Sequence, residues 1–379
     1  MKHSIFPKLI FTLIFFLFTV VSTTVAQNGG ENGKGLEETL VKLAKGAAKA
    51  YVSPIISPFG TNLNGGWFHS APMAKMFGLK MELGLVGMGT FYPEDVQKNF
   101  DWTGQFSFNS TQAAKLIADS NLVILDPSLE NALIDAITKL DFNVTIAGPT
   151  INGSSEEEIK VGFNGADVQV EYPQGSGNFL HYAIDPDDLS LKFGGLKLLK
   201  NFVPFLAPQA TIGTILGTQA TIRWLPRQIN EFPLVSGITD DIGKFSWFGW
   251  GIQHNPGVFF PTPLPLDISA GYFKQTFKVG EIFKAETTAF GITVSKRLGI
   301  GVLNLTPYAG YLRESSKLHF KYQFILEGRP PIDIDFDFEG ENRNRFTVGC
   351  SLRLLLFNIN ADYNMGKYKS ATVGIMFAL

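Results

Sequence analysis

The chain has 379 residues, of which 17% are charged, against about 25% in an average soluble domain, and it contains 39 glycines and 34 phenylalanines. The formal net charge of −2 argues against a nucleic-acid partner. Cys350 is the single cysteine, which excludes an intrachain disulfide. This composition is typical of an envelope protein rich in β-strands.

Residues 1–26 have the pattern of a cleaved signal peptide. Lys2 and Lys8 give a positive start, and residues 9–21 form an apolar run interrupted only by threonines. This run is shorter than the roughly 20 apolar residues that a spanning helix needs. Small residues at 24–26 precede a predicted cleavage ahead of Gln27. We therefore expect export, with an uncleaved anchor as the alternative.

Residues 27–60 are predicted to contain a linker and an amphipathic helix. The apolar stripe of this helix includes Leu36, Leu40, Leu43 and Tyr51. Pro54 is expected to end it, because the residue before a proline is disfavoured in a helix. Three placements stay open. The helix is a packing element at the periplasmic mouth of a barrel, a plug inside that barrel, or a basic helix on the membrane surface.

The next segment begins with a strand over residues 79–90 and continues into an irregular region over residues 92–208. A helix is predicted to start at Asp126, where an N-cap residue is followed by proline in the first turn. Weaker strand candidates cover 142–146, 159–163 and 168–172. Long loops over a barrel mouth and strands with insertions both remain possible for this region.

Strict alternation of apolar and polar residues dominates the second half of the chain and ends at the C-terminus. The alternating runs cover 220–224, 248–253, 266–272, 290–295, 303–311, 318–324, 332–339, 346–354, 357–364 and 372–379. In the last run Val373, Ile375, Phe377 and Leu379 form one apolar face. A strand with one lipid face spans a membrane only in a closed barrel, because lipid cannot satisfy an open backbone edge.

The sequence therefore predicts an all-β fold, an antiparallel transmembrane β-barrel of about 12–16 strands over residues 61–379, with an N-terminal helical segment and a long loop or insertion region at 92–208. From the alternation, the predicted lumen-facing residues are Arg223, Asn304, Thr306, Tyr308 and His319. The predicted lipid-facing residues are Phe248, Trp250, Phe320 and Tyr322. The remaining aromatics Trp224, Trp247 and Tyr272, together with Trp250, belong either to interfacial girdles or to ordinary strand packing.

One run carries acids on its polar face, namely Asp333, Asp335, Asp337 and Glu339. Carboxylates are Ca²⁺ ligands, but alternate residues of one strand rise in a line and do not surround an ion. We therefore interpret this run as a solvated barrel face or as a hairpin above the membrane.

Short stretches along most of the mature chain resemble a group of uncharacterised Gram-negative outer-membrane barrel proteins. They are LNGGWF at 63–68, FGL at 77–79, PQATIG at 208–213, GTQATIRWLP at 217–226, DISAGYF at 267–273 and YAGYLRESS at 308–316. In architecture, a helical segment before such a barrel is similar to the long-chain fatty-acid transporters. This likeness concerns the fold, so no substrate residue is carried over.

No cluster of residues in the sequence indicates catalysis or a cofactor. His69, His181, His254 and His319 are scattered without zinc spacing, and the neighbouring His69 and Ser70 are weak support for a hydrolase. We expect no metal, no cofactor and no enzymatic activity, with an outer-membrane lipase as the enzyme alternative.

The leading functional prediction is an exported, monomeric barrel of the bacterial outer membrane that passes a small, hydrophobic solute. Its expected partners are membrane lipid, the barrel assembly machinery and a hydrophobic small molecule, with no nucleic acid. The first alternative is a structural or assembly barrel that presents residues 92–208 to a partner protein. The second is a soluble periplasmic β-protein, which the acidic run at 332–339 favours.

Overall fold

The computed structural model describes residues 33–92, 97–119, 124, 126–154, 156–191, 202–225, 244–300, 302–324 and 332–379. The predicted signal peptide lies outside these ranges. None of the helices in them is long and apolar enough to cross a membrane. The chain forms two compact units. The barrel unit comprises Pro54–Val96, Leu199–Tyr322 and Asp335–Leu379, and the second unit comprises the remaining residues.

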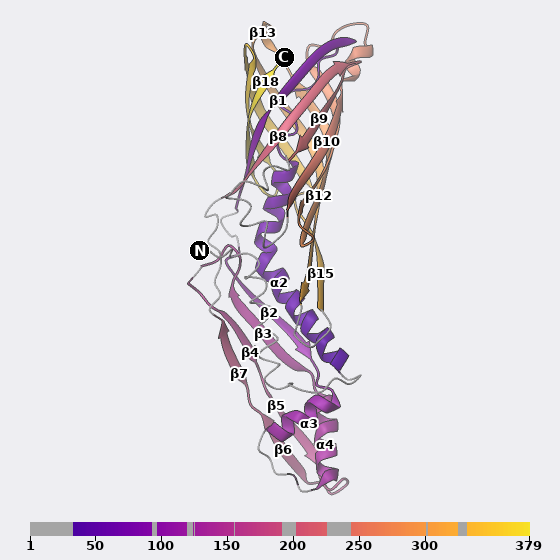
Figure 1. Cartoon of the computed structure of the whole chain (residues 1–379), viewed down its shortest axis with the longest axis vertical. Coiled ribbons are helices and arrows are strands. Elements are labelled where there is room, and N and C mark those ends of the chain that lie inside the picture. The colour runs from indigo at the N-terminus through magenta and orange to yellow at the C-terminus, as the bar shows by residue number, and fades with distance from the viewer. Residues whose placement is uncertain are drawn as a thin grey trace. The chain divides into compact units, whose positions relative to one another are not determined.

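The barrel unit is a closed ring of antiparallel strands (Figure 1). In ring order the strands are β1 (Phe77–Phe91), β8 (Phe202–Ile215), β9 (Thr218–Trp224), β10 (Phe245–His254), β11 (Asp267–Val279), β12 (Phe283–Ser295), β14 (Leu303–Phe324), β16 (Asn344–Leu354), β17 (Phe357–Met365) and β18 (Ser370–Ala378). The first and last strands pair with each other, with Leu83 opposite Phe377. Pairing of β12 with β14 completes the ring.

Over the residues that the structure describes, the ring has ten strands, so the expected count of 12–16 is too high, for three reasons. The runs at 303–311 and 318–324 are one continuous strand, β14. The run at 332–339 forms β15 (Ile332–Glu339), which pairs with β14 off the ring, as does the short β13 (Leu298–Ile300). The weaker strand candidates between 142 and 172 form β3, β4 and β5, which belong to two smaller sheets outside the ring.

The two faces of the barrel wall differ as the alternation predicts. Outward side chains are large, apolar and exposed, among them Leu83, Trp250, Ile292, Leu305 and Ile375. Inward side chains are mostly polar and buried, among them Gln209, Thr221, Gln253, Thr306 and Asn360. An apolar outer belt around a polar interior is the arrangement of a transmembrane barrel. The final strand also confirms its prediction, because Phe377 and Leu379 point outward and β18 closes on β1.

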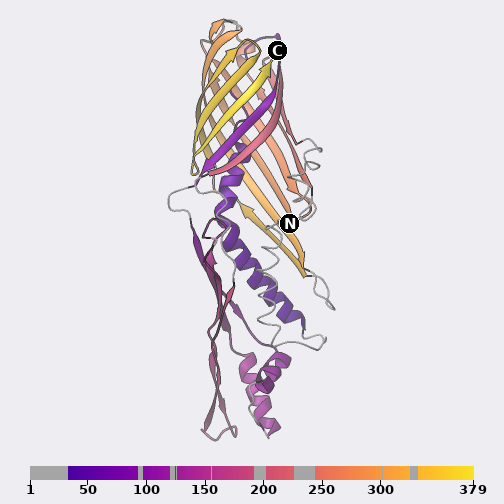
Figure 2. The same cartoon turned by 60° about the vertical axis from the view of Figure 1, so that its left-hand side comes forward.

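The two ends of the barrel differ in their connections. At the turn end, which carries the C-terminus, Leu216 and Gly217 join β8 to β9, and Leu355 and Leu356 join β16 to β17. The connection of β10 to β11 at this end includes the short 3-10 helix η2 (Pro256–Phe259). At the loop end, β14 and β15 reach beyond the ring, opposite the C-terminus (Figure 2).

The helix α2 runs from Gly33 to Asn64, so the prediction that it ends at Pro54 is wrong. Pro54 has no N–H to donate to the carbonyl of Ala50, four residues earlier. The hydroxyl of Ser53 donates to that carbonyl instead, at 3.0 Å. Such a local replacement lets a helix pass through a proline. The last turns of α2, from Pro54 to Asn64, belong to the barrel unit and enter the ring (Figure 2).

The second unit has its own apolar core. It contains a four-stranded sheet of β2 (Asn99–Phe106), β3 (Phe142–Pro149), β4 (Ile159–Phe163) and β7 (Asp187–Leu191), and a hairpin of β5 (Ala166–Glu171) and β6 (Phe179–Ile184). The helices α3 (Ser110–Asp119) and α4 (Pro127–Thr138) pack on the hairpin and on Phe142. Asp126 caps α4 by accepting from the N–H of Ser128 at 2.8 Å, as predicted.

Candidate functional site

The candidate site is the barrel lumen, which is filled by the last residues of α2 and the segment that follows them. We call residues 62–71 (NLNGGWFHSA) the lumen plug. All of them are buried except Gly66, which is half-buried. Gly66 has a φ of 63°, a conformation that favours glycine and that commonly follows the end of a helix. The glycine pair in this stretch therefore ends α2 inside the barrel and redirects the chain toward the turn end.

Two buried arginines of the wall hold the C-terminal end of α2. The last carbonyls of a helix have no partner within it and carry a partial negative charge, so cations there are stabilising. Arg223 on β9 donates to the carbonyls of Leu63, at 3.2 Å, and Gly65, at 2.8 Å. Arg345 on β16 donates to the carbonyl of Thr61 at 2.6 Å. The helix end is thus bound from two sides of the wall.

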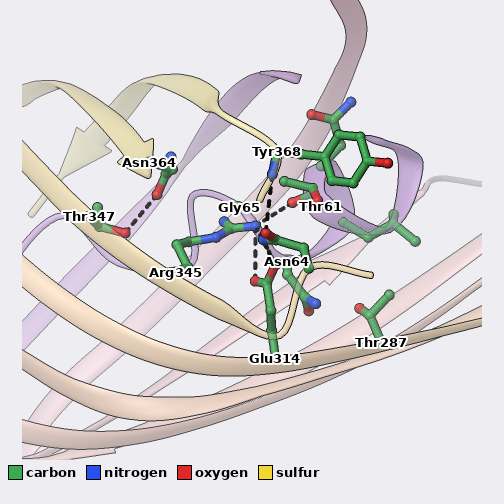
Figure 3. A network of polar contacts seen from close by, with 12 residues as sticks. Thr61, Asn64, Gly65, Thr287, Glu314, Arg345, Thr347, Asn364 and Tyr368 are labelled. Atoms are coloured by element: carbon green, nitrogen blue, oxygen red, sulfur yellow. Dashed lines mark hydrogen bonds and ion pairs between the residues drawn. The ribbon is translucent and has the colours of Figure 1, made fainter. Parts of the chain in front are cut away.

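Arg345 is also part of a buried ion pair with Glu314 of β14 (Figure 3). Their charged atoms are 3.0 Å apart, and each side chain is only 1% exposed. Asn342 donates to the same carboxylate, and the side-chain amide of Asn64 donates to the carbonyl of Ser315 next to it. The pair therefore connects the two wall strands to the lumen plug in one polar network.

Arg223 is held by neutral groups. Its Nε donates to Gln209 Oε1 at 2.7 Å, and its guanidinium carbon is 4.0 Å from the centre of a Trp67 ring. Gln275 on β11 also donates to the carbonyl of Leu63. A buried cation without these partners would be strongly unfavourable. The plug therefore supplies three of the partners of Arg223, namely the carbonyls of Leu63 and Gly65 and the ring of Trp67.

The rings of Trp67 and Phe68 fill the apolar part of the lumen. Trp67 stacks on Phe273 with ring centroids 5.2 Å apart, and Phe68 meets Tyr308 edge-on at 6.1 Å. A Cβ at Gly249 would lie 2.9 Å from the Trp67 ring, and one at Gly310 would lie 2.7 Å from the Phe68 ring. The wall glycines at these positions make room for the plug.

Further polar contacts bind the rest of the plug to the wall. Asn62 accepts from the hydroxyl of Thr90 on β1 at 2.6 Å. The His69 ring lies 3.0 Å from the carboxylate of Glu82, also on β1, and Lys80 pairs with the same carboxylate at 3.1 Å. The N–H of Ala71 donates to Ser295 on β12 at 3.0 Å. All these contacts are made by side chains of the wall, so none replaces a bond of the strand ladder.

The structure brings together four of the five residues that the alternation assigned to the lumen. Arg223, Asn304, Thr306 and Tyr308 are buried inside the barrel. His319 does not lie with them. It is on the outer face of β14, 38% exposed, 2.8 Å from Asp337 and 3.5 Å from Asp335.

The expectations for His319 and Phe320 failed for one reason. The sequence predicts two strands here, and the apolar face of the second would be its even-numbered residues, which were therefore expected to face lipid. In the structure β14 is one continuous strand, and its even-numbered residues point inward along both halves. Phe320 therefore lies on the inner side, against Phe283 and Phe336. Phe248 and Trp250 point outward as expected, and the side chain of Tyr322 lies outside the described residues. Trp250 and Tyr272 form an outward pair at 5.7 Å, whereas Trp247 is buried.

The helix residues proposed for the plug lie before the segment that fills the lumen. Tyr51 belongs to the second unit, where its carbonyl accepts from the N–H of Ile151 at 3.0 Å. For Leu36, Leu40 and Leu43 only the helical backbone is described. The residues that the sequence reasoning missed are Glu314, Arg345 and Gln275. Glu314 is an even number of residues from the inward Tyr308, and Arg345 is two residues from the inward Thr347, so both fall on the inward face of their strands. Extending each alternating run by a few residues therefore predicts both.

A closed antiparallel ring with an apolar belt and a polar, plugged interior defines the protein as an outer-membrane type of β-barrel. The chain belongs to a family of unknown function (DUF6588), whose model matches residues 1–379. No curated protein matches the sequence.

Several solved structures of outer-membrane proteins are similar to this chain. One is a bacterial polysaccharide outer membrane secretin, at 8% identity, with 79% of this chain and 98% of that chain covered and a TM-score of 0.21. Another is OmpT of Vibrio cholerae, at 11% identity, with 80% and 99% covered and a TM-score of 0.22. A third is an anion-selective porin from Comamonas acidovorans, at 9% identity, with 80% and 99% covered and a TM-score of 0.17. The barrel assignment itself rests on the ring, the belt and the lumen of this chain.

Proposed function

We propose that the protein is a plugged channel of the outer membrane, which passes a small, hydrophobic solute when the lumen plug moves. The observation that carries this proposal is how the lumen is closed. Residues 62–71 are held by side chains of the wall, such as Arg223 at Leu63 and Gly65 and Thr90 at Asn62, and Arg345 holds the preceding Thr61. None of these contacts is strand pairing. The plug can therefore leave while every ladder hydrogen bond of the barrel stays intact.

The same proposal includes export, orientation and the absence of enzymatic activity. The predicted signal peptide at 1–26 would deliver the chain to the periplasm, and the barrel assembly machinery would insert it as a monomer. Bacterial barrels place short turns in the periplasm and longer loops outside the cell. By this rule the turn end faces the periplasm and the loop end faces outward. Passage requires no catalytic group, since the solute is moved and not converted.

The test is solute flux through reconstituted protein with a loosened plug. Glu314→Gln removes the carboxylate of the buried pair and leaves Arg345 without its counter-charge, which costs about 3–5 kcal/mol for a buried pair. We expect this variant to speed the swelling of liposomes in a small neutral solute, relative to the wild type. The matched control is Glu341→Gln, since Glu341 pairs with Lys367 at 2.9 Å but is 52% exposed. Flux that stays at the wild-type level in a folded Glu314→Gln protein would contradict a movable plug.

A second function is favoured by the fold of the second unit. The described residues between 97 and 191 share one apolar core and lie between β1 and β8 in the chain. Such a unit is suited to presenting a surface to a partner protein, as the first alternative predicts. Phe91 and Phe202 are directly paired, so a two-residue Asn-Gly turn can replace everything between them. If solute flux through this shortened barrel is unchanged but cells that carry it behave like cells without the protein, partner binding would be favoured over solute passage.

A further inference from the structure

The wall of the barrel changes its chemistry along the strands toward the loop end. On the outer face of β14, Leu305 and Tyr311 are followed by Lys317, while on the inner face Thr306 is followed by Phe320. Strands β11 and β12 change in the same way, because Lys278 and Lys284 point outward next to the inward rings of Phe277 and Phe283. A lipid-facing wall is apolar outside, so the segments with charged outer faces lie beyond the lipid.

The inner face of these segments carries a continuous group of aromatic rings, which we call the aromatic mouth. It consists of Phe59, Phe205, Phe277, Phe283, Phe320 and Phe336. Phe283 and Phe320 have centroids 4.8 Å apart, and Phe320 stacks on Phe336 at 5.4 Å. Of these rings only that of Phe277 is fully buried, and the others are half-buried. The surface is therefore accessible in part, and the six side chains that define it are all apolar.

Phe59 of α2 occupies the centre of the aromatic mouth. Its centroid lies 5.3 Å from that of Phe205, 5.6 Å from that of Phe277 and 5.4 Å from that of Phe283. The planes cross at 85°, 66° and 75°, so all three contacts are edge-on. Edge-on contact at this separation is a preferred geometry between aromatic rings. The three wall residues thus form a preformed receptor for one phenyl ring.

We propose that the aromatic mouth is a binding site for small molecules with a single, uncharged aromatic ring, which takes the place of the Phe59 ring. The proposal rests on the proposed passage and names its solute class. Phe59 lies on the same helix whose end is bound by Arg223 and Arg345, only a few residues before the lumen plug. A ligand that displaces Phe59 therefore competes with the closed position of α2, which connects binding to opening.

The test is direct binding to the full-length protein in detergent, with iodobenzene as the probe. Trp247 reports on the site, since its ring lies 4.9 Å from that of Phe205 and an iodine atom quenches indole fluorescence on contact. We expect saturable quenching that is lost in Trp247→Phe. Quenching of the outward Trp250 should rise linearly with the probe, because it measures partition into the micelle.

Two variants and a second probe decide the outcome. Phe59→Ala removes the competing ring and should tighten binding of the probe about tenfold, because the ligand no longer has to displace Phe59 before it can occupy the site. Phe283→Asn should abolish saturation, whereas the lipid-facing Phe248→Asn should preserve it. If Phe283→Asn does not fold, the Phe59→Ala result decides alone. Quenching without saturation in both the wild type and Phe59→Ala would overturn the site, and equal saturation by 1-iodohexane would overturn its preference for aromatic rings.

This experiment measures binding without transport, so its failure is separable from that of the channel. Saturable binding together with unchanged flux in Glu314→Gln would keep the site and reject the passage. Flux without saturable binding would keep the passage and reject the site.

Discussion

The position of β12 in the membrane can be tested with two side chains on its outer face. Ile292 and Thr288 both point outward from β12. They are four residues apart, which is about 13 Å along a strand and, at a tilt of about 40°, about 10 Å along the membrane normal. Ile292 is 54% exposed and is flanked by Ala270 and Tyr311, whereas Thr288 lies between Lys274 and Ser315. Ile292 is thus in the apolar belt and Thr288 at its edge.

Ile292→Arg should destabilise the folded barrel by about 2–4 kcal/mol, the cost of an arginine near the middle of the bilayer, and Thr288→Arg by about 0–1 kcal/mol. The measurement is the free energy of unfolding in lipid vesicles by denaturant titration, with heat-dependent gel mobility as the check for a closed barrel. The ring is the same in both variants, so the difference reports depth alone. Equal stability of the two proteins would refute the conclusion that β12 crosses a bilayer at Ile292.

Deleting residues 373–379 should abolish insertion into the outer membrane, because β1 and β17 would lose their pairing partner in lipid. The heat-dependent gel mobility of the truncated protein checks this prediction, and a normal mobility shift would show that closure does not need β18. In a double-mutant cycle, Glu314→Gln and Arg345→Met should each destabilise the protein by about 3–5 kcal/mol, and the double variant by clearly less than their sum, since it leaves no unpaired buried charge; additive losses in the denaturant titration would contradict the pairing. In the second unit, the hydrogen bond from Tyr172 holds the pKa of Asp126 below its usual range, so the cap of α4 is fully present above the ordinary carboxyl pKa and is lost as the pH falls through the lowered value. Hydrogen exchange in α4 should therefore lose protection in acid, and Asp126→Ala should remove that pH dependence; equal acid sensitivity in both proteins would place its origin elsewhere.

The wall of the barrel could be predicted from the sequence, because alternation with a period of two is a local property of each strand. Phe377 and Leu379 were assigned to the outer face, and Arg223 and Thr306 to the inner face, from neighbouring residues alone. The cap of α4 at Asp126 is local in the same sense. Each of these predictions depends on residues within a few positions, so no distant contact was needed to make it.

Only the tertiary structure decided what fills the barrel and where the strands end. The position of the end of α2 inside the ring depends on Arg223 and Arg345, which come from strands far along the chain. The inward position of Phe320 depends on β14 being one strand, since the alternation on each side of a predicted break is compatible with either face. The sequence by itself determined a two-faced wall, because the pleat of a strand is local. The closure of the ring by β1 and β18, the position of the plug and the place of Phe59 in the aromatic mouth were decided by contacts between residues more than a hundred positions apart.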